Sequence, residues 1–312
     1  MTDMRDSSGA ASPDLQTLSQ VSDPLCPPSQ DAQTPSLRKP HKAAETARVA
    51  HAGREGSVST LHTPRRPKLD ARLRAAADWV LPCETCADIG CDHGRLGTTL
   101  LLEKRCRRLL AADVSAKALQ KAIARINAQG LRDQTVFAHA NGLDALDALP
   151  GGKADTICIL GMGGETLAGI LMRGKNRLQG ARLVLGAQTE LPLTREALVK
   201  IGYHLQAEQV ISSEGRLYIL MLATPAPKDV PAYTKREITL GPCFLRELPS
   251  TWQPWLLKRE KLLASALAAM RQAKTIQQTE RLAAVQLELD VTRDALAALA
   301  AQADTGGKGR EP

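Results

Sequence analysis

One short segment of the chain gathers two carboxylates, an imidazole and two glycines. This segment, Asp88–Gly94 (DIGCDHG), lies between an apolar run that ends at Ala87 and an amphipathic run that begins at Leu96. Glycine lets the backbone approach a ligand where a Cβ would collide, and such crevices at the carboxyl ends of strands hold nucleotides. The segment therefore predicts a site for a cofactor that contains a nucleoside.

The spacing of the glycines favours a cofactor without phosphates. Gly90, Gly94 and Gly97 lack the G-x-G-x-x-G spacing that seats a pyrophosphate, which argues against a nicotinamide oxidoreductase. Asp92 would repel a pyrophosphate and attract a cation. S-adenosylmethionine carries a sulfonium and an ammonium, and we expect it to be bound by Asp88, Gly90 and Asp92. The alternative is that both aspartates only cap the following helix.

Two further segments supply expected contacts to the nucleoside. Asp113 ends an apolar run 23 residues after Gly90, where a doubly wound sheet places the acid that accepts both ribose hydroxyls. Asn141 and Gly142 follow the third predicted strand, and the Asn141 amide can hydrogen-bond an adenine edge. The alternatives are a helix cap for Asp113 and a plain turn residue for Asn141.

A bend rich in glycine follows the fourth predicted strand. Gly161, Met162, Gly163 and Gly164 leave backbone amides and carbonyls open toward a methyl donor and its acceptor. We expect the first three to contact the cofactor. The chain lacks the Asn- or Asp-Pro-Pro-aromatic motif that many amino-methylating enzymes have at this place.

Alternating strand and helix patterns predict the sheet that positions these segments. Strands are expected at 85–90, 108–114, 135–139, 154–160, 182–187, 203–211 and 217–223, with helices beginning near residues 69, 96, 115, 165 and 192. Such alternation builds a parallel sheet covered on both faces. The final hairpin is typical of the methyltransferase variant, so we predict an α/β, doubly wound, Rossmann-like class I methyltransferase sheet.

Helical heptads replace strands after residue 230. The two predicted seams contain Leu256, Leu263, Leu267 and Met270, and then Leu282, Val285, Leu289, Leu296 and Leu299. Their phase slips across 271–280, which predicts an antiparallel coiled-coil hairpin; the alternative is one long helix that dimerises. The expected organisation is a disordered leader (1–64), a methyltransferase domain (65–230), a coiled-coil domain (231–302) and a disordered tail (303–312).

Charge and cysteine content indicate partners and compartment. A net charge of +8 and a pI near 9.2 favour attraction to nucleic acid. The chain has seven cysteines and neither a signal peptide nor a long apolar span, which predicts a reducing, cytoplasmic compartment and no membrane. The pair Cys83 and Cys86 has no second pair at zinc-finger spacing, so we expect buried thiols and no metal.

Three motifs together resemble the bacterial tRNA adenine-22 N1-methyltransferase (TrmK) family. They are Asp-Ile-Gly-x-Asp-His (88–93), Ile-x-Gly-Met-Gly-Gly (159–164) and Leu-Gly-Pro (240–242), and the likeness covers about residues 67–300. The resemblance implies S-adenosylmethionine as cofactor, a coiled coil that helps to hold tRNA, and methylation of N1 of an adenine in the tRNA D-arm region. It places Asp88, Gly90, Asp92 and His93 on the first motif of the family, and Asp113 on its ribose-binding acid.

Two segments depart from the family pattern. Residues 140–143 read Ala-Asn-Gly-Leu where the family has Gly-Asp-Gly-Leu, and residues 185–188 read Leu-Gly-Ala-Gln where it has Leu-Gln-Pro-Asn. These departures affect the pocket for the target base. They keep open a methyltransferase of another RNA or of a small molecule, and a non-catalytic tRNA-binding protein.

In the expected reaction, adenine N1 attacks the methyl group with its free lone pair, so no base has to remove a proton first. The enzyme must instead align the nitrogen, the methyl carbon and the sulfur. We expect Asp92 to stabilise the developing cation or grip the base amino group, and His93 to position the loop, the alternative for His93 being a structural hydrogen bond. We expect a monomer. Nine basic residues are expected to contact tRNA phosphates: Arg72, Arg74, Arg95, Arg173, Lys175, Arg177, Lys258, Arg259 and Lys261.

Overall fold

The computed structural model describes residues 66–272 and 279–307. The chain divides into two units, 1–60 and 61–312, and the elements below all belong to the second. The predicted leader and the end of the predicted tail lie outside the described residues.

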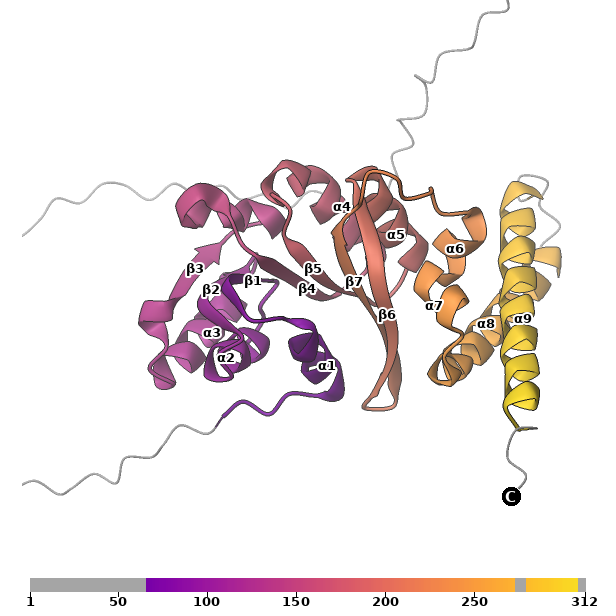
Figure 1. Ribbon diagram of the computed structural model, residues 1–312, viewed down its shortest axis with the longest axis horizontal. Coiled ribbons are helices and arrows are strands. Elements are labelled where there is room, and N and C mark those ends of the chain that lie inside the picture. Colours follow the sequence, from indigo (N-terminus) through magenta and orange to yellow (C-terminus); the bar gives the residue numbers. More distant parts are fainter. Residues whose placement is uncertain (1–65, 273–278, 308–312) are drawn as a thin grey trace, which may run out of the picture. The chain divides into compact units, whose positions relative to one another are not determined.

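A seven-stranded sheet forms the centre of this unit (Figure 1), in the order β3-β2-β1-β4-β5-β7-β6. Its strands are β1 (Cys83–Ile89), β2 (Cys106–Asp113), β3 (Thr135–His139), β4 (Thr156–Met162), β5 (Arg182–Ala187), β6 (Tyr203–Ser213) and β7 (Arg216–Pro225). The first five are parallel, whereas β7 pairs antiparallel with both β5 and β6. The predicted fold class and the terminal hairpin are confirmed, and each predicted strand ends within two residues of the observed one.

Nine α-helices accompany the sheet in the described part of the chain. They are α1 (Ala71–Trp79), α2 (Arg95–Leu102), α3 (Ala116–Ala128), α4 (Gly164–Gly174), α5 (Leu191–Lys200), α6 (Lys235–Leu240), α7 (Pro242–Glu247), α8 (Gln253–Gln272) and α9 (Thr279–Gly307). Successive strand residues point to opposite faces, so Leu109 of β2 joins the core beneath α1, α2 and α3, whereas Leu110 joins the core beneath α4 and α5. Both faces are therefore covered, as the apolar strands predict (Figure 1).

The order of the strands creates a crevice between β1 and β4. The chain moves outward from β1 to β2 and β3, and then returns to pair β4 with the other side of β1. Ligands of doubly wound sheets bind at such a reversal, outside the carboxyl ends of the strands. The segments after β1 and β4 meet there, and these segments carry the two glycine motifs of the sequence.

The C-terminal helices α8 and α9 pack side by side and antiparallel. Leu263, Leu267 and Leu289 form their small core, and the ion pair of Glu260 with Arg293 joins them at 2.9 Å. The alternative of a single long helix is therefore wrong for the described residues, while coiled-coil geometry stays a prediction. Helix α9 continues to Gly307, beyond the predicted end of the coiled coil at residue 302.

Candidate functional site

A cavity of about 250 Å³ opens at the crevice between β1 and β4. Its walls come from α1, the end of β1 and the segment after it, the start of α2, the end of β4 and the residue after β5: Arg72, Leu73, Asp88, Gly90, Cys91, Asp92, His93, Arg95, Leu96, Leu160, Gly161 and Gln188. The structure thus brings together five of the ten residues predicted for the site: Asp88, Gly90, Asp92, His93 and Gly161. The other five, at positions 113, 141, 142, 162 and 163, lie outside this wall.

Two wall residues need glycine for their conformation. Gly90 has φ +73° and Gly161 has φ +81°, in the left-handed region that other residues disfavour. A Cβ on Gly90 would lie 3.2 Å from the Met162 methyl, and one on Gly161 would lie 3.0 Å from a guanidinium nitrogen of Arg72. The glycines thereby keep backbone, rather than side chains, against the cavity.

Asp113 fixes the segment after β1 from the neighbouring strand. One carboxylate oxygen accepts the backbone N–H of Asp92 at 2.9 Å, and the other accepts that of Ser115 at 2.8 Å. Asp92 itself has φ +48°, a strained conformation that this hydrogen bond helps to hold. Each oxygen keeps a second lone pair, so the expected contact with ribose hydroxyls stays a prediction beside this structural role.

Asp88 is a buried carboxyl in the cavity wall. Only 4% of the residue is exposed, and the carboxylate accepts the backbone N–H of Gly97 at 3.2 Å. Burial, together with the charges of Asp113 and Asp92, raises the pKa of Asp88 to about 7, against the effect of the Gly97 hydrogen bond. The helix-cap alternative therefore describes part of what Asp88 does, but the residue also faces the cavity.

The raised pKa of Asp88 predicts a pH dependence of stability in the ligand-free protein. Between pH 4 and 7 the folded chain keeps a proton on Asp88 that the unfolded chain has lost, so the free energy of unfolding falls as pH rises through this window. We expect Asp88→Asn to remove this contribution. The free energy of unfolding of the variant should therefore fall less between pH 4.5 and pH 7.5 than that of the protein with Asp88. Urea denaturation of both proteins at the two pH values measures the difference, and equal pH slopes would contradict the assignment.

His93 connects the same segment to α3. Its backbone carbonyl accepts a hydrogen bond from Arg125 Nε at 2.8 Å, and its ring Nε2 lies 3.0 Å from the Lys121 ammonium and 3.5 Å from the Asp92 carboxylate. These contacts suit the predicted positioning role. The predicted catalytic pair, Asp92 and His93, is thus in contact at the rim of the cavity.

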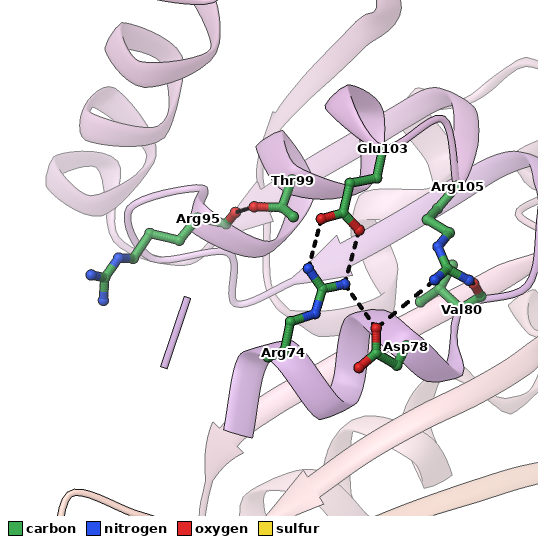
Figure 2. A network of polar contacts seen from close by, with 7 residues as sticks. All are labelled: Arg74, Asp78, Val80, Arg95, Thr99, Glu103 and Arg105. Atoms are coloured by element: carbon green, nitrogen blue, oxygen red, sulfur yellow. Dashed lines mark hydrogen bonds and ion pairs between the residues drawn. The ribbon is translucent and has the colours of Figure 1, made fainter. Parts of the chain in front are cut away.

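Helix α1 covers one side of the cavity and is held there by ion pairs (Figure 2). Arg74 donates to Glu103 at 2.6 Å and to Asp78 at 2.9 Å, and Asp78 also lies 3.8 Å from Arg105. The clamp ties α1 to the end of α2 and to the start of β2. Arg72 of the same helix turns toward the cavity, with its guanidinium 5.2 Å from the ring centre of Tyr218.

The glycine bend after β4 packs against the segment that follows β5. The Gln188 N–H donates to the Met162 carbonyl at 3.0 Å, and the Gly164 N–H donates to the Thr189 carbonyl at 2.9 Å. A Cβ on Gly164 would lie 2.3 Å from the Glu190 carbonyl oxygen, so this glycine is required for close packing. Gln188, one of the positions that depart from the family pattern, thus supports the bend.

Asn141 and Gly142 are placed at the end of β3, away from the cavity wall. Asn141 is exposed and accepts a hydrogen bond from Arg173 at 3.5 Å, while Gly142 is buried with φ +61° against Ile170. Their contact with an adenine edge stays a prediction.

The cavity residues fit S-adenosylmethionine. The carboxylates of Asp88 and Asp92 match a sulfonium and an ammonium, and the guanidinium groups of Arg72 and Arg95 match the carboxylate of the same molecule. Both arginines, which the sequence predicts as tRNA contacts, lie in this wall, and so do Leu73, Cys91, Leu96 and Leu160, for which the sequence predicts no such role. The only feature of the sequence that could have placed these residues in the wall is that most of them lie close to the glycine motifs.

Four of the nine basic residues expected to contact tRNA lie beside carboxylates of this chain. Arg72 lies 3.9 Å from Asp70, and the closer pairs are Arg74 with Glu103, Arg177 with Asp147 and Arg259 with Glu288. Arg95 lines the cofactor cavity, so Arg173, Lys175, Lys258 and Lys261 are better placed to bind phosphates.

Five of the six described cysteines are buried and all six are free thiols. No described group of three or more His, Cys, Asp or Glu side chains is arranged to hold a metal ion, and no described helix has the length and apolarity to span a membrane.

Comparison with known proteins finds similarity along most of this unit. A model of the methyltransferase domain matches residues 69–221. The tRNA (adenine(22)-N1)-methyltransferase of Bacillus subtilis is 30% identical over 175 residues, which are 56% of this chain and 72% of the relative.

Solved structures show the same fold. The crystal structure of the B. subtilis m1A22 tRNA methyltransferase TrmK superposes with a TM-score of 0.68 at 25% identity, over 74% of this chain and 99% of that one. A Streptococcus pneumoniae protein solved in complex with S-adenosyl-L-methionine superposes with a TM-score of 0.63 at 23% identity, over 72% of this chain and 98% of that one.

Proposed function

The chain belongs to the bacterial tRNA (adenine(22)-N1)-methyltransferase family, and from this premise we propose that it transfers a methyl group from S-adenosylmethionine to N1 of an adenine in the D-arm region of tRNA. The observation that carries the proposal is the meeting of the two family motifs at one cavity, where Gly90 and Gly161 expose backbone and Asp88 and Asp92 supply negative charge.

Different residues at the site bind the cofactor and admit the acceptor base. When bound, S-adenosylmethionine supplies an electrophilic methyl group on its sulfonium. Asp88 and Asp92 stabilise positive charge, Asp113 binds the ribose hydroxyls, and Asn141 and Gly142 bind the adenine of the cofactor. Gly161, Met162 and Gly163 form the surface along which the acceptor nitrogen reaches the methyl carbon.

Asp92 and His93 act on the acceptor side of the cavity. The target adenine must leave its stack to expose N1, and it gains positive charge as the methyl group arrives. The Asp92 side chain is 73% exposed, so it is free to face a base that enters from solvent. His93 positions it through the contacts with Lys121 and Arg125.

We expect Asp92→Asn to slow methyl transfer at saturating cofactor by about tenfold or more, because an amide cannot balance the charge that develops on the base. Single-turnover methylation of tRNA measures the rate, and calorimetry measures cofactor affinity. A rate within twofold of that of the unmodified protein would dismiss the electrostatic role of Asp92.

The decisive test of the function maps the product. Purified full-length protein is incubated with S-adenosylmethionine and unmodified tRNA, and the nucleosides are identified by nuclease digestion and mass spectrometry. N1-methyladenosine at a D-arm position supports the proposal. Methylation of another RNA, or cofactor-independent tRNA binding without transfer, would instead support one of the two alternatives that the departures at 140–143 and 185–188 keep open.

We also infer a monomeric, cytoplasmic protein whose methyltransferase domain ends near residue 230. The six cysteines in the described part of the chain are free thiols, which suits a reducing compartment. The apolar side chains of Leu263, Leu267 and Leu289 are buried between α8 and α9, so this seam is used within one chain. Sedimentation of the purified protein tests the oligomeric state.

A further inference from the structure

A second cavity, of about 240 Å³, lies on the other side of the segment that follows β5. Gln188 lines both cavities, and Thr189, Leu191 and Pro192 continue the wall of the second. Helix α8 forms the opposite wall with Trp255, Lys258 and Leu262. The C-terminal helices thus face the cofactor cavity across a single backbone segment.

The second cavity is bounded by the end of an aromatic stack. The chain has only eight Phe, Trp and Tyr residues, and three of them stack here. Phe244 and Trp252 are buried with ring centres 5.0 Å apart and planes 10° apart, and Trp255 continues the stack at 6.5 Å and 14°. The two buried rings fix the orientation of the Trp255 indole, which is partly exposed at the cavity. A ring held in this way loses little conformational freedom when it stacks on a ligand.

The remaining wall combines apolar surface with Lys258 and the ion pair of Arg259 with Glu288. Lys258 follows Trp255 by three positions, so both lie on the same face of α8. Lys258 is exposed, and it forms no ion pair with any described carboxylate, whereas the neighbouring Arg259 is paired with Glu288. Leu262 is 57% exposed beside them. A flat aromatic face with an apolar surround and a free ammonium is the chemistry that holds an unpaired base and its phosphate.

We propose that the Trp255 cavity binds the base of the nucleotide adjacent to the methylated adenine, with the indole stacked on that base and Lys258 on its phosphate. This inference rests on the proposed function. The target adenine must face the bend at Gly161–Gly163, and the segment Gln188–Glu190 separates that place from the second cavity. When the target base leaves the helix, its neighbour loses a stacking partner, and Trp255 replaces it. The cavity therefore offsets part of the cost of flipping the target base.

The test measures binding of tRNA to the full-length protein in the presence of S-adenosylhomocysteine, so that no transfer is needed. We expect Trp255→Leu to raise the Kd for tRNA by about 5- to 150-fold, the range that corresponds to loss of one stacked base. Trp255→Phe should restore most of the affinity. Leu257→Ala changes an exposed apolar residue of α8 outside the cavity and should leave the Kd unchanged.

A second readout reports the stacking of the neighbouring base directly. We expect the fluorescence of 2-aminopurine, placed next to the target adenine, to be quenched when unmodified protein binds the tRNA, and to stay bright in the Trp255→Leu complex. Equal Kd values for Trp255→Leu and unmodified protein, or unquenched 2-aminopurine in the unmodified complex, would overturn the inference. If Trp255 proves necessary for tRNA binding but no methyl group is transferred, the proposed function fails and the base-binding site stands.

Discussion

Replacing Asp113 by alanine is expected to weaken S-adenosylmethionine binding by about 10- to 150-fold. A hydrogen bond to a charged group contributes about 1.5–3 kcal/mol, and this range of free energy corresponds to that range of affinity. The structure adds a second reason for the loss. The variant also removes the acceptor for the Asp92 and Ser115 amides, so the strained segment after β1 loses its anchor on β2.

Calorimetric titration of the cofactor measures the effect of Asp113→Ala. Asp133→Ala is the matched control, because Asp133 is an exposed acid that precedes β3, at the opposite end of the strands. Asp113→Asn separates the two roles: the amide oxygen still accepts one backbone amide, but the charge-assisted contact with ribose is lost. Unchanged affinity in Asp113→Ala would remove this residue from the cofactor site.

Replacing Glu208 by leucine is expected to lower the free energy of unfolding by about 3–5 kcal/mol, the usual cost of leaving one member of a buried ion pair without its partner. Arg195 and Glu208 have fully buried side chains 2.8 Å apart. Arg195 also donates to the carbonyls of Ile238 and Thr239, each at 2.9 Å, and Glu208 accepts the Cys243 N–H at 3.1 Å.

This buried pair explains the third family motif, Leu-Gly-Pro at 240–242. Gly241 has φ +112°, and a Cβ at this position would lie 2.5 Å from a Glu208 carboxylate oxygen. The motif therefore lets α6 and α7 close over the pair and joins the sheet to the helices that follow.

Urea denaturation of Glu208→Leu measures the loss of stability, with Glu196→Ala as the control. Glu196 and Lys200 form an exposed pair at 3.8 Å, which contributes at most about 1 kcal/mol. If both variants lose the same small amount, the buried pair does not hold the link between sheet and C-terminal helices.

Local patterns in the sequence determined the fold and the centre of the site. Apolar runs of strand length and amphipathic runs of helix length give all seven strands and the main helices, because both periodicities are properties of neighbouring residues. The sequence also predicts the place of Gly90 and Gly161 in the site, since a left-handed backbone at a strand end needs glycine whatever lies around it. The acids at positions 88 and 92 followed from their place beside these glycines.

Contacts between distant segments were decided only by the tertiary structure. Arg72 reaches the cofactor cavity because α1 is clamped by Arg74 to Glu103, twenty-nine positions along the chain. Trp255 faces Gln188 because α8 packs beside the segment after β5. No local pattern distinguishes an arginine that binds RNA from one paired with a remote carboxylate. Which basic and aromatic side chains are free is set by packing between elements, and this packing depends on the whole chain.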